Sequence, residues 1–145
     1  MLHFGDNLAN FKPIEHLYKT DVIKIARLLN SRDEVINQSP SAGFWKNQED
    51  LEDIAYWIIN EGPIIIPKQF NDMQIAQAEK IAKKLSWEKL DMCLKMISKE
   101  DDIENIVRTV ELPIEIINGI VEITKKAKKY KSRKILVSLR EEEID

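Results

Sequence analysis

The chain has 145 residues, enough for one domain with a modest core, and its 43% hydrophobic and 32% charged residues are typical of a folded globular protein. The formal net charge of −3 argues against a globally basic nucleic-acid-binding surface. Because Cys93 is the single cysteine and no apolar run approaches the roughly 20 residues of a membrane span, we expect a cytoplasmic protein without disulfides.

The first clear helix is predicted to begin at Thr20, a suitable N-cap residue. One apolar stripe at helical spacing runs over about three turns and consists of Val22, Ile25, Ala26 and Leu29. Lys19 precedes this cap, where a cation opposes the helix dipole. An anion held between the Lys19 ammonium group and unpaired first-turn N–H groups would explain the lysine. The alternative is an ordinary solvated lysine.

Asn30 is expected to follow the end of this helix, and a short helical piece and a loop of small residues around Ser41 come next. A hydroxyl group beside a glycine lets backbone N–H groups approach an anion, although Ser41 also suits an ordinary turn. Residues 48–53 are strongly acidic and read as the solvated start of a helix that ends near Gly62. Residues 62–70 contain the only convincing extended segment, between Pro63 and Pro67.

Four further helical segments are expected in the second half of the chain. A capping box of Asn71 and Gln74 starts the first, and Ser86 caps the second. The third is a short helix over residues 103–110, and the fourth begins with Pro113 at its first position. The predicted fold is therefore mainly α, with about six helices and minor extended segments at residues 1–4, 62–70 and 135–139.

Two residues within these helices suggest packing roles. Cys93 lies on an apolar stripe with Leu90, Leu94 and Ile97, so we expect a small core residue and no nucleophile. Gly119 costs a helix about 1 kcal/mol against alanine, and we expect it to permit a close approach between helices.

A basic cluster follows the last helix, with seven cations among residues 125–134. Cations are expected at a helix C-terminus because of the dipole, so a solvated helix end is the first interpretation. A role in binding a phosphate or a substrate is the second, and a helix-turn-helix that binds nucleic acid is the third. Glu115 and Ile116, early in the last helix, argue against base recognition. His3 and His16 have no ligands at metal-binding spacing, so no metal site is predicted.

Several of these stretches form an ordered set: Gly5-Asp6, Pro13-Ile14, Leu17-Tyr18-Lys19-Thr20 and Pro40-Ser41-Ala42-Gly43-Phe44-Trp45. The set resembles the C-terminal half of ammonia-dependent NAD synthetases, α/β ATP pyrophosphatases that amidate deamido-NAD through an adenylated carboxylate. The resemblance covers about residues 4–50. It returns more loosely over residues 86–133, where Ser86-Trp87-Glu88-Lys89-Leu90-Asp91 is similar to the family's Ser-Tyr-Glu-x-Leu-Asp.

This resemblance implies roles for eight residues. Asp6 would be catalytic, in the nicotinate and ammonia pocket, and the ATP phosphates would contact Lys19, Thr20 and Ser41. Substrate binding would involve Asn10, Asp50, Lys131 and Arg133. The implied ligands are deamido-NAD and ATP with Mg²⁺, none of them expected to be tightly bound.

The sequence also departs from the family pattern. The 145 residues contain no Ser-Gly-Gly-x-Asp-Ser loop, and Glu49 and Leu51 replace a hydroxyl residue and an acid. We therefore expect a partial or split NAD synthetase that is inactive alone and forms either a homodimer or a complex with a separate chain carrying the ATP loop. The alternative is a non-catalytic helical interaction domain or a helix-turn-helix-like binding module.

As one domain, the chain divides into a motif region (1–50), an atypical insertion (51–85), a helical region (86–134) and a tail (135–145).

Overall fold

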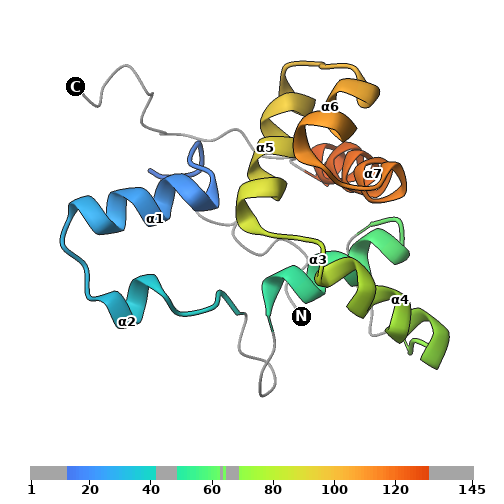
Figure 1. Ribbon diagram of the computed structural model, residues 1–145, viewed down its shortest axis with the longest axis horizontal. Coiled ribbons are helices and arrows are strands. Elements are labelled where there is room, and N and C mark those ends of the chain that lie inside the picture. Colours follow the sequence, from blue (N-terminus) through green and yellow to red (C-terminus); the bar gives the residue numbers. More distant parts are fainter. Residues whose placement is uncertain (1–12, 42–48, 63, 65–68, 131–145) are drawn as a thin grey trace.

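A computed structural model describes residues 13–41, 49–62, 64 and 69–130. Within these residues the chain forms helices and no strand, and Figure 1 shows their arrangement. The helices are α1 (Lys19–Leu28), α2 (Asp33–Ile36), α3 (Asp50–Ile59), α4 (Asp72–Ala82), α5 (Trp87–Ser98), α6 (Ile103–Val110) and α7 (Ile114–Tyr130). The prediction of a mainly helical chain is confirmed. The predicted extended segments fall largely or wholly outside the described residues.

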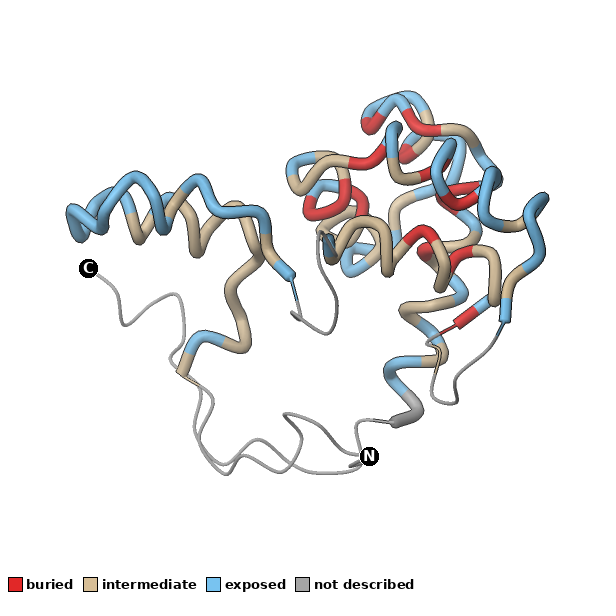
Figure 2. Tube along the Cα trace, turned by 90° about the horizontal axis from the view of Figure 1, so that it is seen from below, coloured by how far each residue is buried: buried red, intermediate tan, exposed pale blue. Residues whose placement is uncertain are grey.

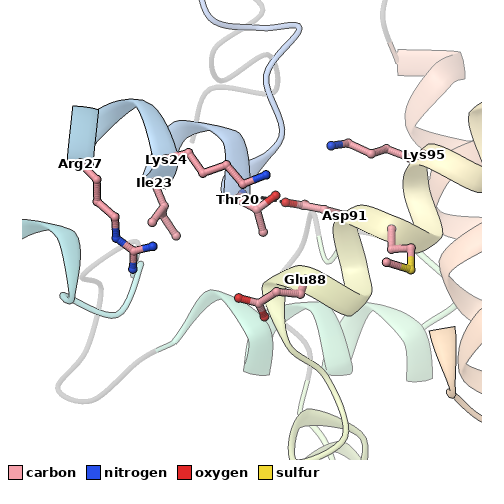
Figure 3. Close-up of a pocket in the computed structure, with 8 residues that line it drawn as sticks. Thr20, Ile23, Lys24, Arg27, Glu88, Asp91 and Lys95 are labelled. Carbon is pink, nitrogen blue, oxygen red and sulfur yellow. Dashed lines mark hydrogen bonds between the residues drawn. The ribbon is translucent and has the colours of Figure 1, made fainter. Parts of the chain in front are cut away.

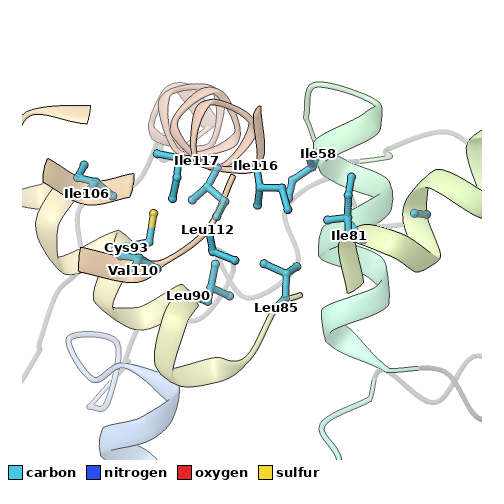
Figure 4. Packing of buried hydrophobic residues seen from close by; sticks show 13 residues of the cluster. Ile58, Ile81, Leu85, Leu90, Cys93, Ile106, Val110, Leu112, Ile116 and Ile117 are labelled. Atoms are coloured by element: carbon cyan, nitrogen blue, oxygen red, sulfur yellow. The ribbon is translucent and has the colours of Figure 1, made fainter. Parts of the chain in front are cut away.

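The hydrophobic core is built by the five helices from α3 to α7 (Figures 2 and 4). Every buried residue of the described part lies between Ala55 and Ile120. The largest fully buried side chains are Ile106, Ile117 and Cys93, which come from α6, α7 and α5. Cys93 is a core residue, as predicted. Helices α3 and α4 belong to this core, because Ala55, Ile58, Ala78 and Ile81 are buried in it.

Local signals in the sequence fix several helix ends. The side chains of Asn71 and Gln74 form the predicted capping box at α4, and the Ser86 hydroxyl accepts a hydrogen bond from the Lys89 N–H at α5. Asn30 has a φ of 54° and follows the C-cap of α1, where its N–H and that of Ser31 donate to carbonyls of the last turn. Pro113 was predicted as the first residue of the last helix, but α7 begins one residue later, at Ile114.

Gly119 allows α7 to approach α3 closely, as predicted. A Cβ atom placed on Gly119 would meet Cγ2 of Ile58 at 2.6 Å, which is inside normal contact distance. No side chain larger than hydrogen fits there unless Ile58 or the helix axis moves.

Helices α1 and α2 form an N-terminal arm, defined here as residues 13–41, that lies beside the core (Figures 1 and 2). None of its residues is buried, and Leu28 and Leu29 are 80% and 74% exposed. The arm contains the motif residues Lys19, Thr20 and Ser41, so these motifs lie outside the hydrophobic core. Among the described residues, no helix is long and apolar enough to cross a membrane.

Candidate functional site

The first turn of α1 carries two of the predicted phosphate-binding residues, and its N-cap lies two residues earlier than predicted. Its N-cap is Tyr18, whose carbonyl accepts hydrogen bonds from the N–H groups of Asp21 and Val22, both at 3.0 Å. The prediction of Thr20 as N-cap is therefore wrong. Thr20 lies inside the first turn, and its own N–H donates to the Asp91 carboxylate of α5 at 2.7 Å.

Three residues of α5 contact this turn, and we call them the α5 ladder: Trp87, Asp91 and Lys95. They are spaced four residues apart and so share one face of the helix. Lys19 places its ammonium nitrogen 5.6 Å from the centre of the Trp87 ring. Asp91 accepts the Thr20 N–H, as Figure 3 shows for these two residues.

Lys95 completes the ladder one turn later. Its ammonium group donates to the Asp21 carboxylate at 3.1 Å and lies 4.6 Å from the centre of the Tyr18 ring. Burial acts to raise the pKa of Asp21, but the hydrogen bond and the charge of Lys95, together with a backbone hydrogen bond at Tyr18 and the charge of Lys24, lower the pKa below its ordinary value of 3.8. Asp21 is therefore held in its charged form.

A groove of about 370 Å³ lies between α1 and α5 (Figure 3). Both helices contribute charged side chains to its lining, which consists of Thr20, Ile23, Lys24 and Arg27 from α1 and Glu88, Asp91, Met92 and Lys95 from α5. The pKa of Glu88 is lowered by its own main-chain N–H and by the Ser86 hydroxyl, so this carboxylate also stays charged. The groove therefore presents both signs of charge at the start of α1.

The predicted anion site is changed by this arrangement. The N–H groups of the first turn were expected to be unpaired, but those of Thr20 and Asp21 donate to the Asp91 carboxylate and the Tyr18 carbonyl. A carboxylate at the positive end of α1 supplies the negative charge that the helix dipole favours. The Lys19 ammonium group has no carboxylate partner among the described residues, so its charge remains available to a ligand.

Ser41 and Asp50 form a second location, at the start of α3. The Asp50 N–H donates to the carbonyl of Pro40 at 3.0 Å, which holds Ser41 beside this helix start. Ser41 does not line the groove between α1 and α5, and in Figure 1 the start of α3 lies away from the start of α1. The structure thus brings Lys19 close to Thr20 and Ser41 close to Asp50, but it keeps the two pairs apart.

The other four predicted residues lie outside the described residues: Asp6, Asn10, Lys131 and Arg133. Within the described ranges, no group of three or more His, Cys, Asp or Glu side chains could hold a metal ion.

Asp91 is the site residue that sequence reasoning missed. It was noted only as the last position of the segment Ser86–Asp91, with no role of its own. A signal was present, because Asp91 adjoins Leu90 and lies two residues before Cys93, at the edge of the buried stripe of α5. An acid at such a position must find a donor, and here the donor belongs to α1.

The helix-turn-helix alternative has its expected elements. Helix α6 ends at Val110, Glu111 is left-handed with a φ of 55°, and α7 starts at Ile114. The first turn of α7 exposes Ile114 and Glu115, neither of which suits an approach to nucleic acid.

Comparison with known proteins gives a consistent result. A family model described as NAD synthase matches residues 1–85. An NH(3)-dependent NAD(+) synthetase of Thermococcus sibiricus is 43% identical over 60 residues, which are 40% of this chain and 24% of that protein. The enzyme of the same name from Methanocaldococcus jannaschii is 28% identical over 122 residues, 84% of this chain and 36% of that protein.

A third relative with this name, from Thermoplasma volcanium, is 45% identical over 52 residues, or 36% of this chain and 22% of that protein. The chain therefore matches only 22% to 36% of the length of these three relatives. No solved structure matches the chain.

Proposed function

The chain belongs to the NAD synthase family, and we propose that it supplies the C-terminal part of an ammonia-dependent NAD synthetase site in the cytoplasm. In this reaction ATP activates the carboxylate of deamido-NAD by adenylation, and ammonia then displaces the adenylate. The proposal is supported by the family match over residues 1–85 and by the relatives' names.

One observation carries the proposed phosphate contact: the ammonium group of Lys19 lies at the first residue of α1, over the Trp87 ring. No carboxylate among the described residues neutralises it, so it can pair with a phosphate oxygen through a charge-assisted hydrogen bond. We propose that the Thr20 hydroxyl assists from the same turn. The Thr20 N–H does not, because Asp91 already accepts it.

The remaining proposed residues bind the substrate side. Ser41 follows Pro40, whose carbonyl accepts the Asp50 N–H at the start of α3, and we propose that the Ser41 hydroxyl contacts ATP phosphate and the Asp50 carboxylate contacts deamido-NAD. For Asp6 as the catalytic acid in the ammonia pocket, and for Asn10, Lys131 and Arg133 as substrate contacts, the support is the family resemblance.

Adenylation needs more than these residues supply. The phosphates, Mg²⁺ and the attacking carboxylate must be held in line, and these 145 residues contain no Ser-Gly-Gly-x-Asp-Ser loop. Among the described residues, no group of three or more His, Cys, Asp or Glu side chains is placed to hold a metal ion. We therefore propose that the chain acts together with a segment that carries the ATP loop and the metal ligands.

The N-terminal arm is the proposed surface for that association. Its exposed apolar side chains are Ile14, Leu28, Leu29 and Val35. Leu17, Val22 and Ile25 of the same arm are half-buried. Apolar patches of this kind mark interfaces. The partner is either the segment with the ATP loop or a second copy of the chain in a homodimer.

The phosphate contact can be tested with pyrophosphate, by NMR chemical-shift perturbation on the full chain. We expect weak binding, with a dissociation constant on the order of 1 mM, centred on Lys19 and Thr20. Lys19→Met keeps the aliphatic stem but removes the charge, and should weaken binding about tenfold. Lys83→Met, a change at the exposed end of α4, is the matched control and should bind as the wild type does.

If the wild type shows no response at Lys19, or if Lys19→Met binds equally well, the phosphate role is refuted. A second function would then be favoured by one observation: the α1 terminus already has an internal anion, Asp91, as its partner. In that case Lys19 only packs on Trp87, and the chain is a non-catalytic helical interaction domain.

A further inference from the structure

We propose that Asp91 is a positioning residue that fixes the first turn of α1, and with it the Lys19 ammonium group, against the helical core. The inference deepens the proposed function and rests on it for the role of Lys19. The docking of α1 itself can be judged independently.

Helix α1 is not attached to the core by fully buried apolar side chains. None of the ten residues of α1 is buried. An isolated helix of this length is marginal in water, so its order must come from contacts with other elements. The contacts that the structure shows between its first turn and α5 are the polar and cation–π contacts of the α5 ladder.

Asp91 is the central member of the ladder. It is 4% exposed and is the one buried charged residue of the described part. A buried carboxylate is costly unless a strong donor compensates it, and the Thr20 N–H at 2.7 Å lies at the positive end of the α1 dipole. The carboxylate and the helix end therefore stabilise each other. Loss of either partner leaves the other unsatisfied.

The three contacts also fix the register between the helices. Lys19, Thr20 and Asp21 are consecutive, and they meet Trp87, Asp91 and Lys95 in the same order. A shift of α1 by one residue would break all three contacts together. Lys19 consequently lies over Trp87 only when the Thr20 N–H is held by Asp91.

This geometry also limits where a phosphate can bind. A phosphate that reached the Thr20 N–H would have to displace the Asp91 carboxylate and would be repelled by it. A phosphate that contacts the Lys19 ammonium group and the Thr20 hydroxyl leaves the docked turn intact. Asp91 thus determines which donors of this turn are offered to a ligand.

The test compares amide hydrogen exchange and pyrophosphate binding in the full chain for three variants. Asp91→Leu keeps the number and branching of the side-chain heavy atoms but removes the acceptor, and should speed exchange of the α1 amides about tenfold or more. Exchange at the core residues Ile106 and Ile117 should change much less. Asp91→Asn retains an uncharged acceptor and should restore most of the α1 protection. Asp102→Ala, which removes the N-cap contact of α6 at 3.1 Å, is the matched control and should leave α1 unchanged.

Pyrophosphate binding separates positioning from simple stability. We expect Asp91→Leu to weaken binding at least fivefold, with recovery in Asp91→Asn, because the ordered turn and not the charge of Asp91 is what the ligand needs. If Asp91→Leu leaves α1 protected, the docking inference fails, whatever pyrophosphate does. If α1 undocks but pyrophosphate binds as before, the positioning role fails while the proposed phosphate contact survives.

If the wild type binds no pyrophosphate while Asp91→Leu undocks α1, the docking inference stands and the proposed function fails. Should Asp91→Leu not fold, Lys95→Met gives the same readout, because it removes the contacts with Asp21 and Tyr18 and leaves the core intact. Unchanged α1 protection in Lys95→Met, together with unchanged pyrophosphate affinity, would overturn the proposal.

Discussion

A methyl group added at Gly119 tests the close contact between α3 and α7. In a solvated helix, Gly→Ala stabilises by about 1 kcal/mol. Here the new Cβ would lie 2.6 Å from Cγ2 of Ile58, and 3.3 Å from its Cβ and Cγ1. Overpacking of a core costs about 1–3 kcal/mol, so we expect Gly119→Ala to be destabilising by about 1 kcal/mol overall.

A double-mutant cycle with Ile58→Ala isolates the clash. Ile58→Ala removes both γ carbons and should itself cost about 2–4 kcal/mol. In that background, Gly119→Ala no longer meets them and should become stabilising, giving a coupling of about 2 kcal/mol between the two positions. The free energies of unfolding are measured by urea denaturation of all four proteins, followed by circular dichroism.

Asn118→Ala is the control, since this exposed residue of α7 adds helix propensity without a clash. It should be mildly stabilising in both backgrounds. If Gly119→Ala stabilises the wild type as much as it stabilises the Ile58→Ala protein, the helices do not approach as described, and the reasoning is refuted.

Three further predictions concern single residues. Cys93 is fully buried, and burial raises the pKa of its thiol to about 11, so it should not react with a disulfide reagent at pH 8 until the protein is unfolded; stoichiometric reaction in the native state would contradict this. Glu100 has a φ of 60°, so Glu100→Gly should raise the free energy of unfolding by about 1 kcal/mol in urea denaturation, and a loss of stability would oppose it. Burial acts to raise the pKa of Asp21, but Lys95, with smaller effects of the Tyr18 backbone and Lys24, brings the folded pKa below the ordinary value of 3.8. The stabilisation of α1 by charged Asp21 is therefore complete above pH 3.8 and is lost as pH falls through the lower folded pKa. Amide protection of α1, corrected for intrinsic exchange, should therefore drop in acid in the wild type but not in Asp21→Asn; equal drops would refute the link.

Sequence reasoning succeeded where structure depends on near neighbours. The capping box of Asn71 and Gln74, the left-handed Asn30 after α1 and the Ser86 cap all follow from residues within one turn of each other. The role of Gly119 was also visible, because a glycine inside an apolar helix needs a packing reason.

The candidate site was less predictable because its contacts are distant in sequence. Thr20 reads as an N-cap locally, but its N–H bonds to Asp91, 71 residues away. The α5 ladder could not be predicted for the same reason, since the spacing of Trp87, Asp91 and Lys95 indicates a contact face only once α1 is known to lie against it. Lys19 and Ser41 were predicted in one pocket because both belong to the family motifs, yet the chain places them at the starts of different helices.

NAD formation in a two-fragment mixture tests whether this chain can complete an NAD synthetase site. The chain is combined with the part of the Methanocaldococcus jannaschii NH(3)-dependent NAD(+) synthetase that precedes the matched region, together with deamido-NAD, ATP, Mg²⁺ and ammonia. We predict no NAD from either fragment alone, NAD from the mixture, and less NAD when the chain carries Lys19→Met but not Lys83→Met. The account would be contradicted by NAD from the chain alone. It would also be contradicted if the mixture stayed inactive while the jannaschii fragment became active with its own C-terminal part.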